Sequence, residues 1–343
     1  MTKRGYAQYL QRWITIRERP GALESACASF ASIGLVLLAW YLLTLGTPEE
    51  RIIDPITLPS LGETVASFPR LWFERALARS AMWSLARVIG GFALAASIAV
   101  PLGVLAGSFL RLNAFLKPMS IFGRNIPVAA LIPLTLMWFG LGETQKVMFI
   151  FLAAVAFVLF DSANAVQRVP DSYLDAAYTL GARILPKQGA IHTLIAGAIY
   201  AVVFGGAYYL LARRPGPNDV ELWSAWRSQL GIMGVAGFVI GFILWYPILS
   251  YQAIQKVLFP LAMPDIVNSL RLLFGLAFGY IMLAEVINAE YGLGAIINLS
   301  QRQGPREHIY LALMLIALLA FGIDRGILAF QRWLFPYRPV GES

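Results

Sequence analysis

The sequence predicts an all-α polytopic membrane protein with eight spans, and two observations, its composition and its long apolar runs, lead to this fold class. Of the 343 residues, 58% are hydrophobic and 13% are charged, whereas soluble domains carry about 25% charged residues. Several apolar runs reach about 18 residues or more, which is enough for a helix to cross a hydrocarbon layer of about 30 Å. The single cysteine, Cys27, excludes an internal disulfide.

The apolar runs give the expected spans in chain order. The first run follows several basic residues and has no small-residue cleavage site after it, so we expect an uncleaved span. The fifth and sixth runs lack Asp, Glu, Lys and Arg, which favours two spans there. An even number of spans puts both termini in the cytoplasm, and the distribution of Lys and Arg favours that orientation. The expected spans are 27–46, 84–108, 125–141, 147–165, 189–212, 229–250, 265–287 and 309–330.

The basic residues give a formal net charge of +8. They do not cluster as a patch with interleaved aromatic residues, and several flank the apolar runs, which is typical of an orientation signal. We therefore expect the lipid bilayer as a partner and no nucleic acid.

A short polar stretch, YLDAAYTLGAR at 173–183, follows the fourth expected span. Asp171 or Ser172 would cap the start of a helix here, and Asp175 would complement the helix dipole. Gly181 would end the helix, since glycine readily takes the left-handed conformation. The stretch holds no nucleophile–base pair and no phosphate-binding loop. From these residues alone, an amphipathic helix on the membrane surface is an equal alternative.

This stretch resembles the EAA loop of bacterial ABC importer permeases, in which Glu-Ala-Ala is followed by three residues and a glycine. Asp175 replaces the Glu, and Ala176, Ala177 and Gly181 stand in register. The resemblance implies that the helix docks into a groove of a cytoplasmic ATPase. Small alanine side chains would allow a close approach, and Gly181 would fix the turn. Segments similar to permeases for taurine, alkanesulfonates, nitrate or bicarbonate are 58–72, 84–107, 124–157, 257–297 and 324–334.

The chain departs from the family after Gly181. In the family about a dozen residues separate this glycine from a hydrophobic-x-Leu-Pro element, but here the nearest counterpart, VLFPLAMP, comes some eighty residues later. We therefore expect a six-span permease core with two inserted transmembrane helices that split the loop. The hairpin is either an accessory that packs in lipid or on the bundle, or it docks an extra subunit or widens the dimer contact. The expected divisions are a cytoplasmic N-terminal segment (1–26), spans one to four with the first half of the coupling loop (27–186), the inserted hairpin (187–252), and the last two spans with a cytoplasmic tail (253–343).

Two groups of residues within the spans are functional candidates. Arg87, Arg271 and Glu285 carry charge inside apolar runs, which is costly in lipid and favours an ion pair with a structural or gating role. Each also lies near a span end, so snorkelling to the interface is the alternative.

The third expected span carries the other group. Asn125, Pro127 and Pro133 interrupt this span, and broken helices at membrane depth usually line a cavity. We expect it to line the solute pathway, with Met137 and Trp138 as candidate gate residues; plain bundle packing is the alternative. With two histidines in the chain, we expect no metal site.

The resemblance implies the transmembrane subunit of an ATP-driven importer in the bacterial inner membrane. It would act with a second copy of itself, cytoplasmic ABC ATPase subunits and an external solute-binding protein. The chain lacks a GxxxxGK[ST] motif, so we expect no enzyme activity and no cofactor in this chain; ATP and Mg²⁺ would belong to the ATPase. An ion-coupled secondary transporter is the alternative, with Glu285 as the only candidate coupling carboxylate. A lipid-modifying enzyme would need a His/Asp/Glu constellation that two scattered histidines do not supply.

Overall fold

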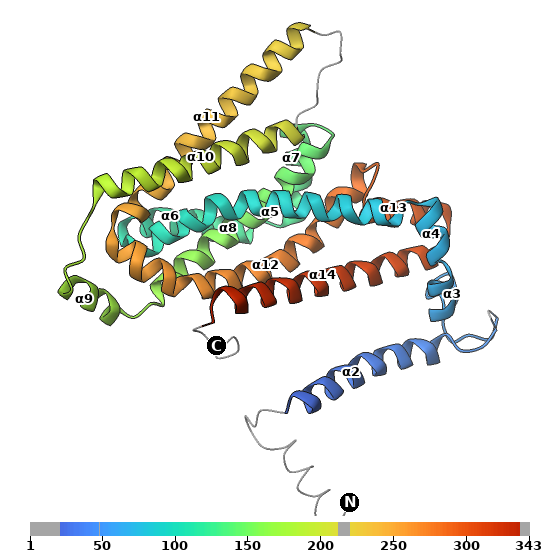
Figure 1. The fold of residues 1–343 in the computed structure, drawn as a ribbon. Coiled ribbons are helices and arrows are strands. Elements are labelled where there is room, and N and C mark those ends of the chain that lie inside the picture. The colour runs from blue at the N-terminus through green and yellow to red at the C-terminus, as the bar shows by residue number, and fades with distance from the viewer. Residues whose placement is uncertain (1–20, 48, 212–219, 337–343) are drawn as a thin grey trace, which may run out of the picture.

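The computed structural model describes residues 21–47, 49–211 and 220–336 (Figure 1). Most of the expected N-terminal segment 1–26 and the end of the expected tail lie outside these described residues. Regular structure within them is helical, apart from one isolated β-bridge. The elements are α2 (Ala22–Leu43), α3 (Leu61–Ala66), α4 (Phe68–Glu74), α5 (Leu77–Ser108), α6 (Leu110–Asn125), η1 (Val128–Ala130), α7 (Leu131–Phe139), α8 (Glu143–Gln167), α9 (Asp171–Thr179), α10 (Pro186–Leu211), α11 (Val220–Ser250), η2 (Ile254–Leu258), α12 (Phe259–Asn288), α13 (Leu293–Gln303) and α14 (Arg306–Leu334).

The expected fold class, an all-α polytopic membrane protein, is confirmed. In the described part of the chain, 7 helices are long and apolar enough to cross a membrane, and the bent pair of α6 with η1 and α7 makes an eighth if it is counted as one span. The helices start and end within a few residues of most expected bounds. Helices α11 and α5 depart most, because α11 begins at Val220 rather than at residue 229 and α5 begins at Leu77 rather than at residue 84.

The expected bounds of the third span, 125–141, are wrong. Helix α6 ends at Asn125, Ile126 is extended, and the chain then turns by 88° into η1 and α7. The cause is Pro127, since a residue before proline is driven out of the helical conformation. Helix α7 has 9 residues, about 14 Å at the helical rise, which is too short to cross a bilayer alone.

The expected loop element VLFPLAMP, residues 257–264, is helical. A π-helix, η2, leads directly into α12. Pro260 lies in the first turn of α12, directly after the π-helix. Pro264 lies inside the helix, and its carbonyl accepts a hydrogen bond of 3.0 Å from Gln331 Nε2 of α14.

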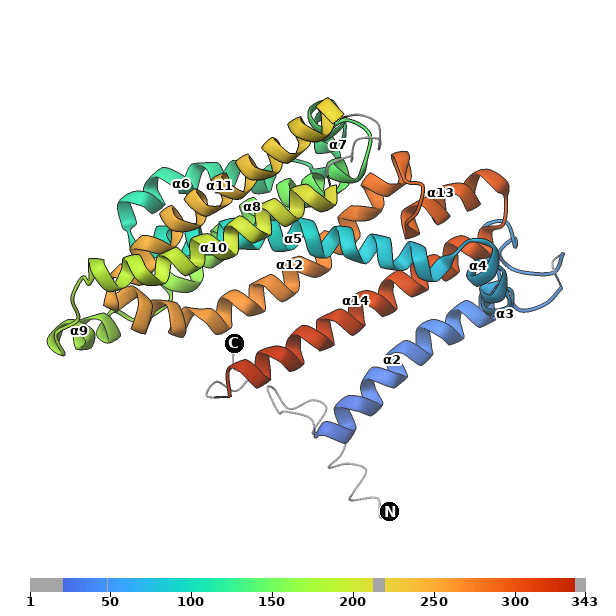
Figure 2. The same cartoon turned by 45° about the horizontal axis from the view of Figure 1, so that its top comes forward.

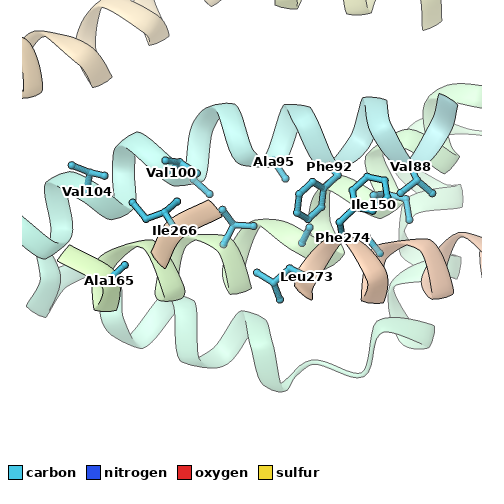
Figure 3. Packing of buried hydrophobic residues seen from close by; sticks show 14 of the residues in the cluster. Val88, Phe92, Ala95, Val100, Val104, Ile150, Ala165, Ile266, Leu273 and Phe274 are labelled. Atoms are coloured by element: carbon cyan, nitrogen blue, oxygen red, sulfur yellow. The ribbon is translucent and has the colours of Figure 1, made fainter. Parts of the chain in front are cut away.

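The core of the bundle lies between α5, α8 and α12 (Figure 3). Lipid is as apolar as these side chains, so close packing rather than transfer from water must hold the helices together. Gly103 and Gly107 of α5 face α8 so closely that an added Cβ would lie 2.5 Å from Ser162 Cβ and 2.6 Å from Val166 Cβ, respectively. On the α12 side, Phe92 and Phe274 meet edge to face with ring centroids 5.4 Å apart.

Two parts of the chain lie outside this core. Helices α10 and α11 pair with each other along their length, and α11 contacts α5 and η2 (Figure 2). The ends of this pair meet in the antiparallel β-bridge between Ile184 and Tyr251, flanked by the 2.8 Å bond from Leu185 N to Ser250 O. Helix α2 stands apart from the bundle in both views and is held at its C-terminal end, where Trp40 Nε1 donates to Pro59 O at 2.9 Å.

Candidate functional site

Helix α9 holds three of the four residues of the EAA-like pattern, and the terminal glycine follows its end. The helix begins after Pro170, whose extended backbone forms the N-cap without a side-chain hydrogen bond. The expectation that Asp171 or Ser172 would be the N-cap is therefore wrong: proline favours the first positions of a helix by its fixed φ, and both residues fall inside the first turn. Asp171 still places a negative charge at the positive end of the helix dipole.

The end of α9 is fixed by hydrogen bonds around Gly181. Its φ of +85° is in the left-handed region. Gly181 N donates to Tyr178 O at 3.0 Å, and Ala182 N donates to Ala177 O at 2.9 Å. These two bonds form a Schellman motif, which satisfies carbonyls that a helix end otherwise leaves free. An added Cβ at Gly181 would meet no atom within 4 Å, so backbone conformation alone explains the glycine.

Helix α9 presents most of its surface to the outside at one end of the bundle (Figures 1 and 2). Asp175 and Ala176 are exposed and Ala177 is half-buried. Leu174 is turned inward and packs against the main core cluster, and α9 also contacts η2. The exposed large side chains near the alanines are Tyr173, Tyr178 and Leu180, the last 88% exposed.

The candidate pathway residues lie at the bend between α6 and α7 and along α7. Asn125, Pro127, Pro133, Met137 and Trp138 are all exposed in the single chain. Helix α7 is anchored on its other face, where Gln145 Nε2 of α8 donates to the buried Thr135 Oγ1 at 3.0 Å. The anchoring leaves Met137, 82% exposed, and Trp138, 60% exposed, on the outward face of α7.

Two of the charged candidates, Arg87 of α5 and Glu285 of α12, meet in a buried ion pair. Arg87 Nη1 lies 2.7 Å from Glu285 Oε1, with the side chains 3% and 0% exposed. Glu143 at the start of α8 binds the other edge of the same guanidinium, at 2.5 Å and 2.8 Å, and Lys146 Nζ lies 2.9 Å from Glu143. The network joins α5, α8 and α12 with balanced charge, two bases against two acids.

A serine hydroxyl and a backbone N–H complete the surroundings of Glu285. Its carboxylate accepts from Ser84 Oγ at 2.8 Å and from Gly294 N, in the first turn of α13, at 3.0 Å. A helix N-terminus favours negative charge. Gly292, the N-cap of α13, has φ +144°, and an added Cβ there would lie 2.5 Å from the Glu285 carboxyl group. The segment before α13 is therefore built closely around this carboxylate.

Arg271 takes no part in this network. It pairs with Asp324 of α14, Nε to Oδ1 at 3.5 Å, with side chains 19% and 40% exposed. Arg271 is fourteen residues before Glu285 on α12, about 21 Å along a helix. The third charged candidate is thus a separate and more exposed contact.

Sequence reasoning missed Ser84, Glu143 and Lys146 as members of the buried network. Glu143 and Lys146 stand at the boundary of an apolar run, where charged residues usually face water, so nothing local indicated that Glu143 would bind a distant arginine. In the described part of the chain, no group of three or more His, Cys, Asp or Glu side chains is arranged to hold a metal ion.

The family model and the relatives that match this chain all describe membrane components of transport systems. A family model described as "Binding-protein-dependent transport system inner membrane component" matches residues 99–258. A putative ABC transporter permease of Methanocaldococcus jannaschii is 24% identical over 311 residues, covering 89% of this chain and 90% of the relative. The taurine transport system permease of Escherichia coli is 23% identical over 314 residues, covering 90% and 89%. The bicarbonate transport system permease of Synechococcus elongatus is 24% identical over 287 residues, covering 83% and 77%.

A solved structure shares the fold. One chain of an inward-facing MetNI methionine ABC transporter aligns with a TM-score of 0.51 and 18% identity, covering 77% of this chain and 97% of that chain.

Proposed function

This chain is a permease subunit of the binding-protein-dependent ABC importers. We propose that it receives motion from its ATPase through helix α9 and passes this motion to the solute pathway. The family implies a separate ATPase that hydrolyses ATP and a solute-binding protein as partners, and places the chain in the bacterial inner membrane. An ion-coupled secondary transporter is not favoured. Both oxygens of Glu285, its only candidate carboxylate, are already occupied by Arg87, Ser84 and Gly294.

Helix α9 is the coupling helix that docks on the ATPase. The observation that carries this proposal is the coincidence of the EAA-like pattern with an exposed helix of fixed end: Asp175, Ala176 and Ala177 lie on α9, and the Schellman motif at Gly181 ends it. The exposed Ala176 and the half-buried Ala177 let another backbone approach closely, while Tyr173, Tyr178 and Leu180 offer large apolar anchors. Aromatic anchors beside small residues are typical of the energetic centre of a protein–protein contact.

Motion of α9 passes to α12 by a short route. Leu174 connects α9 to the core, and the β-bridge between Ile184 and Tyr251 ties the segment after α9 to the segment before η2. Counted through this bridge, three residues from Gly181 to Ile184 and nine from Tyr251 to Pro260 make a path of about a dozen. This matches the family spacing and supports the interpretation of 187–252 as an inserted hairpin.

A second copy of the chain faces the α6–α7 bend, and the two copies line the pathway between them. A non-helical break at membrane depth is tolerated where it is buried in protein or lines a water-filled cavity, not where it faces lipid. The break at Ile126–Pro127 and the exposed Met137 and Trp138 therefore need a cover. Gly275 and Gly279 of α12, where an added Cβ would meet no atom within 4 Å, offer a further surface for close packing.

The α9 end of the bundle is cytoplasmic in this proposal, and the α13 end is external. The start of α2 and the end of α14 both point away from α3, α4 and α13 (Figures 1 and 2), as cytoplasmic termini require. The named relatives transport taurine, bicarbonate or aliphatic sulfonates, so we propose a small sulfonate or carboxylate-type anion as the solute. The Arg87–Glu285 network would hold the external ends of α5, α8 and α12 together as the cytoplasmic end moves.

A pull-down of the tagged, detergent-solubilised chain from its native membrane tests the coupling role. The wild type is expected to recover an ABC ATPase, and Ala177→Asp and Gly181→Pro are expected to lose it while keeping the wild-type elution volume. Gly304→Pro is the matched control, because Gly304 also ends a helix with positive φ (+105°) and donates its N–H, but it follows α13. Loss of the ATPase in the control, or its retention in both α9 variants, would refute the coupling role.

A further inference from the structure

Helix α5 contains a proline at a buried position. Pro101 has no N–H, so the carbonyl of Ser97, four residues earlier, lacks its helical donor. Inside a membrane no water replaces such a donor, and an unsatisfied carbonyl costs several kcal/mol. A donor must therefore come from another helix if α5 is to keep this conformation.

Tyr200 of α10 supplies that donor. Its hydroxyl donates to Ser97 O, and it accepts a hydrogen bond of 3.2 Å from Trp245 Nε1 of α11. Tyr200 is 6% exposed. The chain of bonds runs from α11 through α10 to the one carbonyl of α5 that Pro101 deprives of a partner.

The hairpin is built to hold Tyr200 in this place. Gly237 and Gly241 of α11 lie against it: an added Cβ at Gly237 would be 2.5 Å from Tyr200 O, and one at Gly241 would be 2.7 Å from Tyr200 Cβ. Any larger residue would push α10 away from α11. The Phe204 ring stacks beside the Tyr200 ring, with centroids 6.3 Å apart. A hairpin that merely filled lipid would need neither this glycine pair nor a polar contact at a proline.

We infer that Tyr200 is a positioning residue of the transport cycle, which acts by replacing the hydrogen bond that Pro101 removes from α5. The α10–α11 hairpin then braces α5 at its proline, the weakest point of the helix that carries Arg87 toward the opposite end. Loss of the brace frees α5 to bend independently of α9 and weakens the link between ATP hydrolysis and the pathway. The effect on transport rests on the proposed function; the hydrogen bond does not.

A double-mutant cycle on the purified chain in lipid nanodiscs tests the hydrogen bond. Tyr200→Phe leaves the carbonyl of Ser97 without a donor, and this unsatisfied group is expected to lower the Tm by about 2–5 °C. In the Pro101→Ala background, where the backbone N–H of the introduced alanine would serve Ser97, the same change is expected to leave the Tm unmoved. Tyr208→Phe is the matched control: its hydroxyl bonds Gln229 within the hairpin at 2.5 Å, so its effect should be equal in both backgrounds.

The positioning role is tested on the complex with its ATPase and binding protein. The probe is the binding protein alone, and the readout is the ratio of ATPase activity with it to activity without it. Tyr200→Phe is expected to lower this ratio at least twofold with an unchanged KM for ATP, and to have no effect when added to Pro101→Ala. If Tyr200→Phe does not express, Trp245→Phe removes the neighbouring donor and is expected to act in the same direction.

Three outcomes would overturn the inference. Equal Tm losses from Tyr200→Phe in both backgrounds would show that the hydroxyl does not stand in for the missing N–H of Pro101. If the Tm loss depends on the Pro101 background but the ratio of ATPase activity with and without binding protein does not change, Tyr200 has only a structural role. A chain that recovers no ATPase at all would overturn the proposed function and the transport role with it, and the Tm cycle would then still report on the hydrogen bond separately.

Discussion

The two ends of the bundle are held together by different kinds of contact, charged side chains at the α13 end and mainly backbone hydrogen bonds at the α9 end. At the α13 end, Arg87 and Glu285 form a buried ion pair, and Glu143, whose side chain is 36% exposed, binds the other edge of the guanidinium. At the α9 end, a nine-residue helix with one exposed and one half-buried alanine is held by Leu174 and by backbone hydrogen bonds. Buried charge networks resist partial opening, because each lone charge left behind is costly. A helix held by few contacts, such as α9, moves at a small cost in free energy. The difference is what we expect if the α13 end stays fixed while the ATPase moves the α9 end.

The largest expected effect comes from breaking the buried pair. Glu285→Ala leaves Arg87 without its fully buried partner and should lower the free energy of unfolding by about 3–5 kcal/mol. Arg271→Ala, which removes a half-exposed pair with Asp324, should cost about 0–1 kcal/mol. Thermal unfolding in the same detergent compares them. Adding Arg87→Ala to Glu285→Ala should cost less than the two changes summed, since no charge is then stranded.

If Glu285→Ala and Arg271→Ala lowered the free energy of unfolding equally, burial would contribute nothing beyond charge pairing, and the contrast between the two pairs would be refuted.

The second-largest effect on stability is expected at Gly292, the glycine that packs against the Glu285 carboxyl group. Gly292→Ala introduces both backbone strain at φ +144° and a Cβ that would lie 2.5 Å from the carboxyl group, and should cost about 3 kcal/mol. Gly304→Ala, with φ +105° and no atom within 4 Å of the added Cβ, should cost about 1 kcal/mol from strain alone. The difference in unfolding free energy isolates the packing around Glu285. Identical values for the two variants would mean that the network tolerates an extra methyl group.

The α9 end should separate stability from function. Gly181→Ala strains one exposed turn and should cost about 1 kcal/mol, with little change in Tm. If α9 docks on the ATPase, the same change should weaken ATPase binding about tenfold, equivalent to about 1.4 kcal/mol. Titration of the purified ATPase against the chain in nanodiscs measures this, with Gly304→Ala as control. An unchanged affinity would remove the basis for calling α9 the driven end.

Much of the fold follows from local properties that the sequence displays. Apolar length marks a span wherever it falls, so seven spans were predictable one by one. The bend at Ile126–Pro127 was harder, because residues on both sides are apolar and only Pro127 hints that α6 stops there. The end of α9 was predictable for a related reason: a glycine with positive φ acts within its own turn. Its N-cap was mispredicted because Pro170 competes with the usual capping residues.

The contacts between distant residues could not be predicted in the same way. Arg87 and Glu285 were conspicuous as charges in apolar runs, but that Glu143 would join them, and that Arg271 would turn to Asp324 instead, depends on how three helices pack. Pro101 was visible as a proline within a span. Its partner Tyr200 lies ninety-nine residues later in a different helix, and an aromatic residue in an apolar run carries no mark of such a role.

The smallest expected effect sharpens the comparison within the α13 end itself. Arg51 and Glu63 form an ion pair there, Nη2 to Oε1 at 2.8 Å, but the Glu63 side chain is 43% exposed. The Arg51 guanidinium and the Ser60 backbone N–H lower the pKa of Glu63 from 4.5 to about 2.

Because the folded pKa of Glu63 lies below the unfolded one, the stability from this carboxylate is complete above pH 4.5 and is lost as the pH falls toward 2. The Tm gap between the wild type and Glu63→Gln should therefore narrow from pH 6 to pH 3, and also in 1 M NaCl, since water and salt screen a carboxylate that is partly exposed. The gap for Glu285→Ala should persist in salt. A salt-resistant gap for Glu63→Gln would show that exposure is not what distinguishes the two pairs.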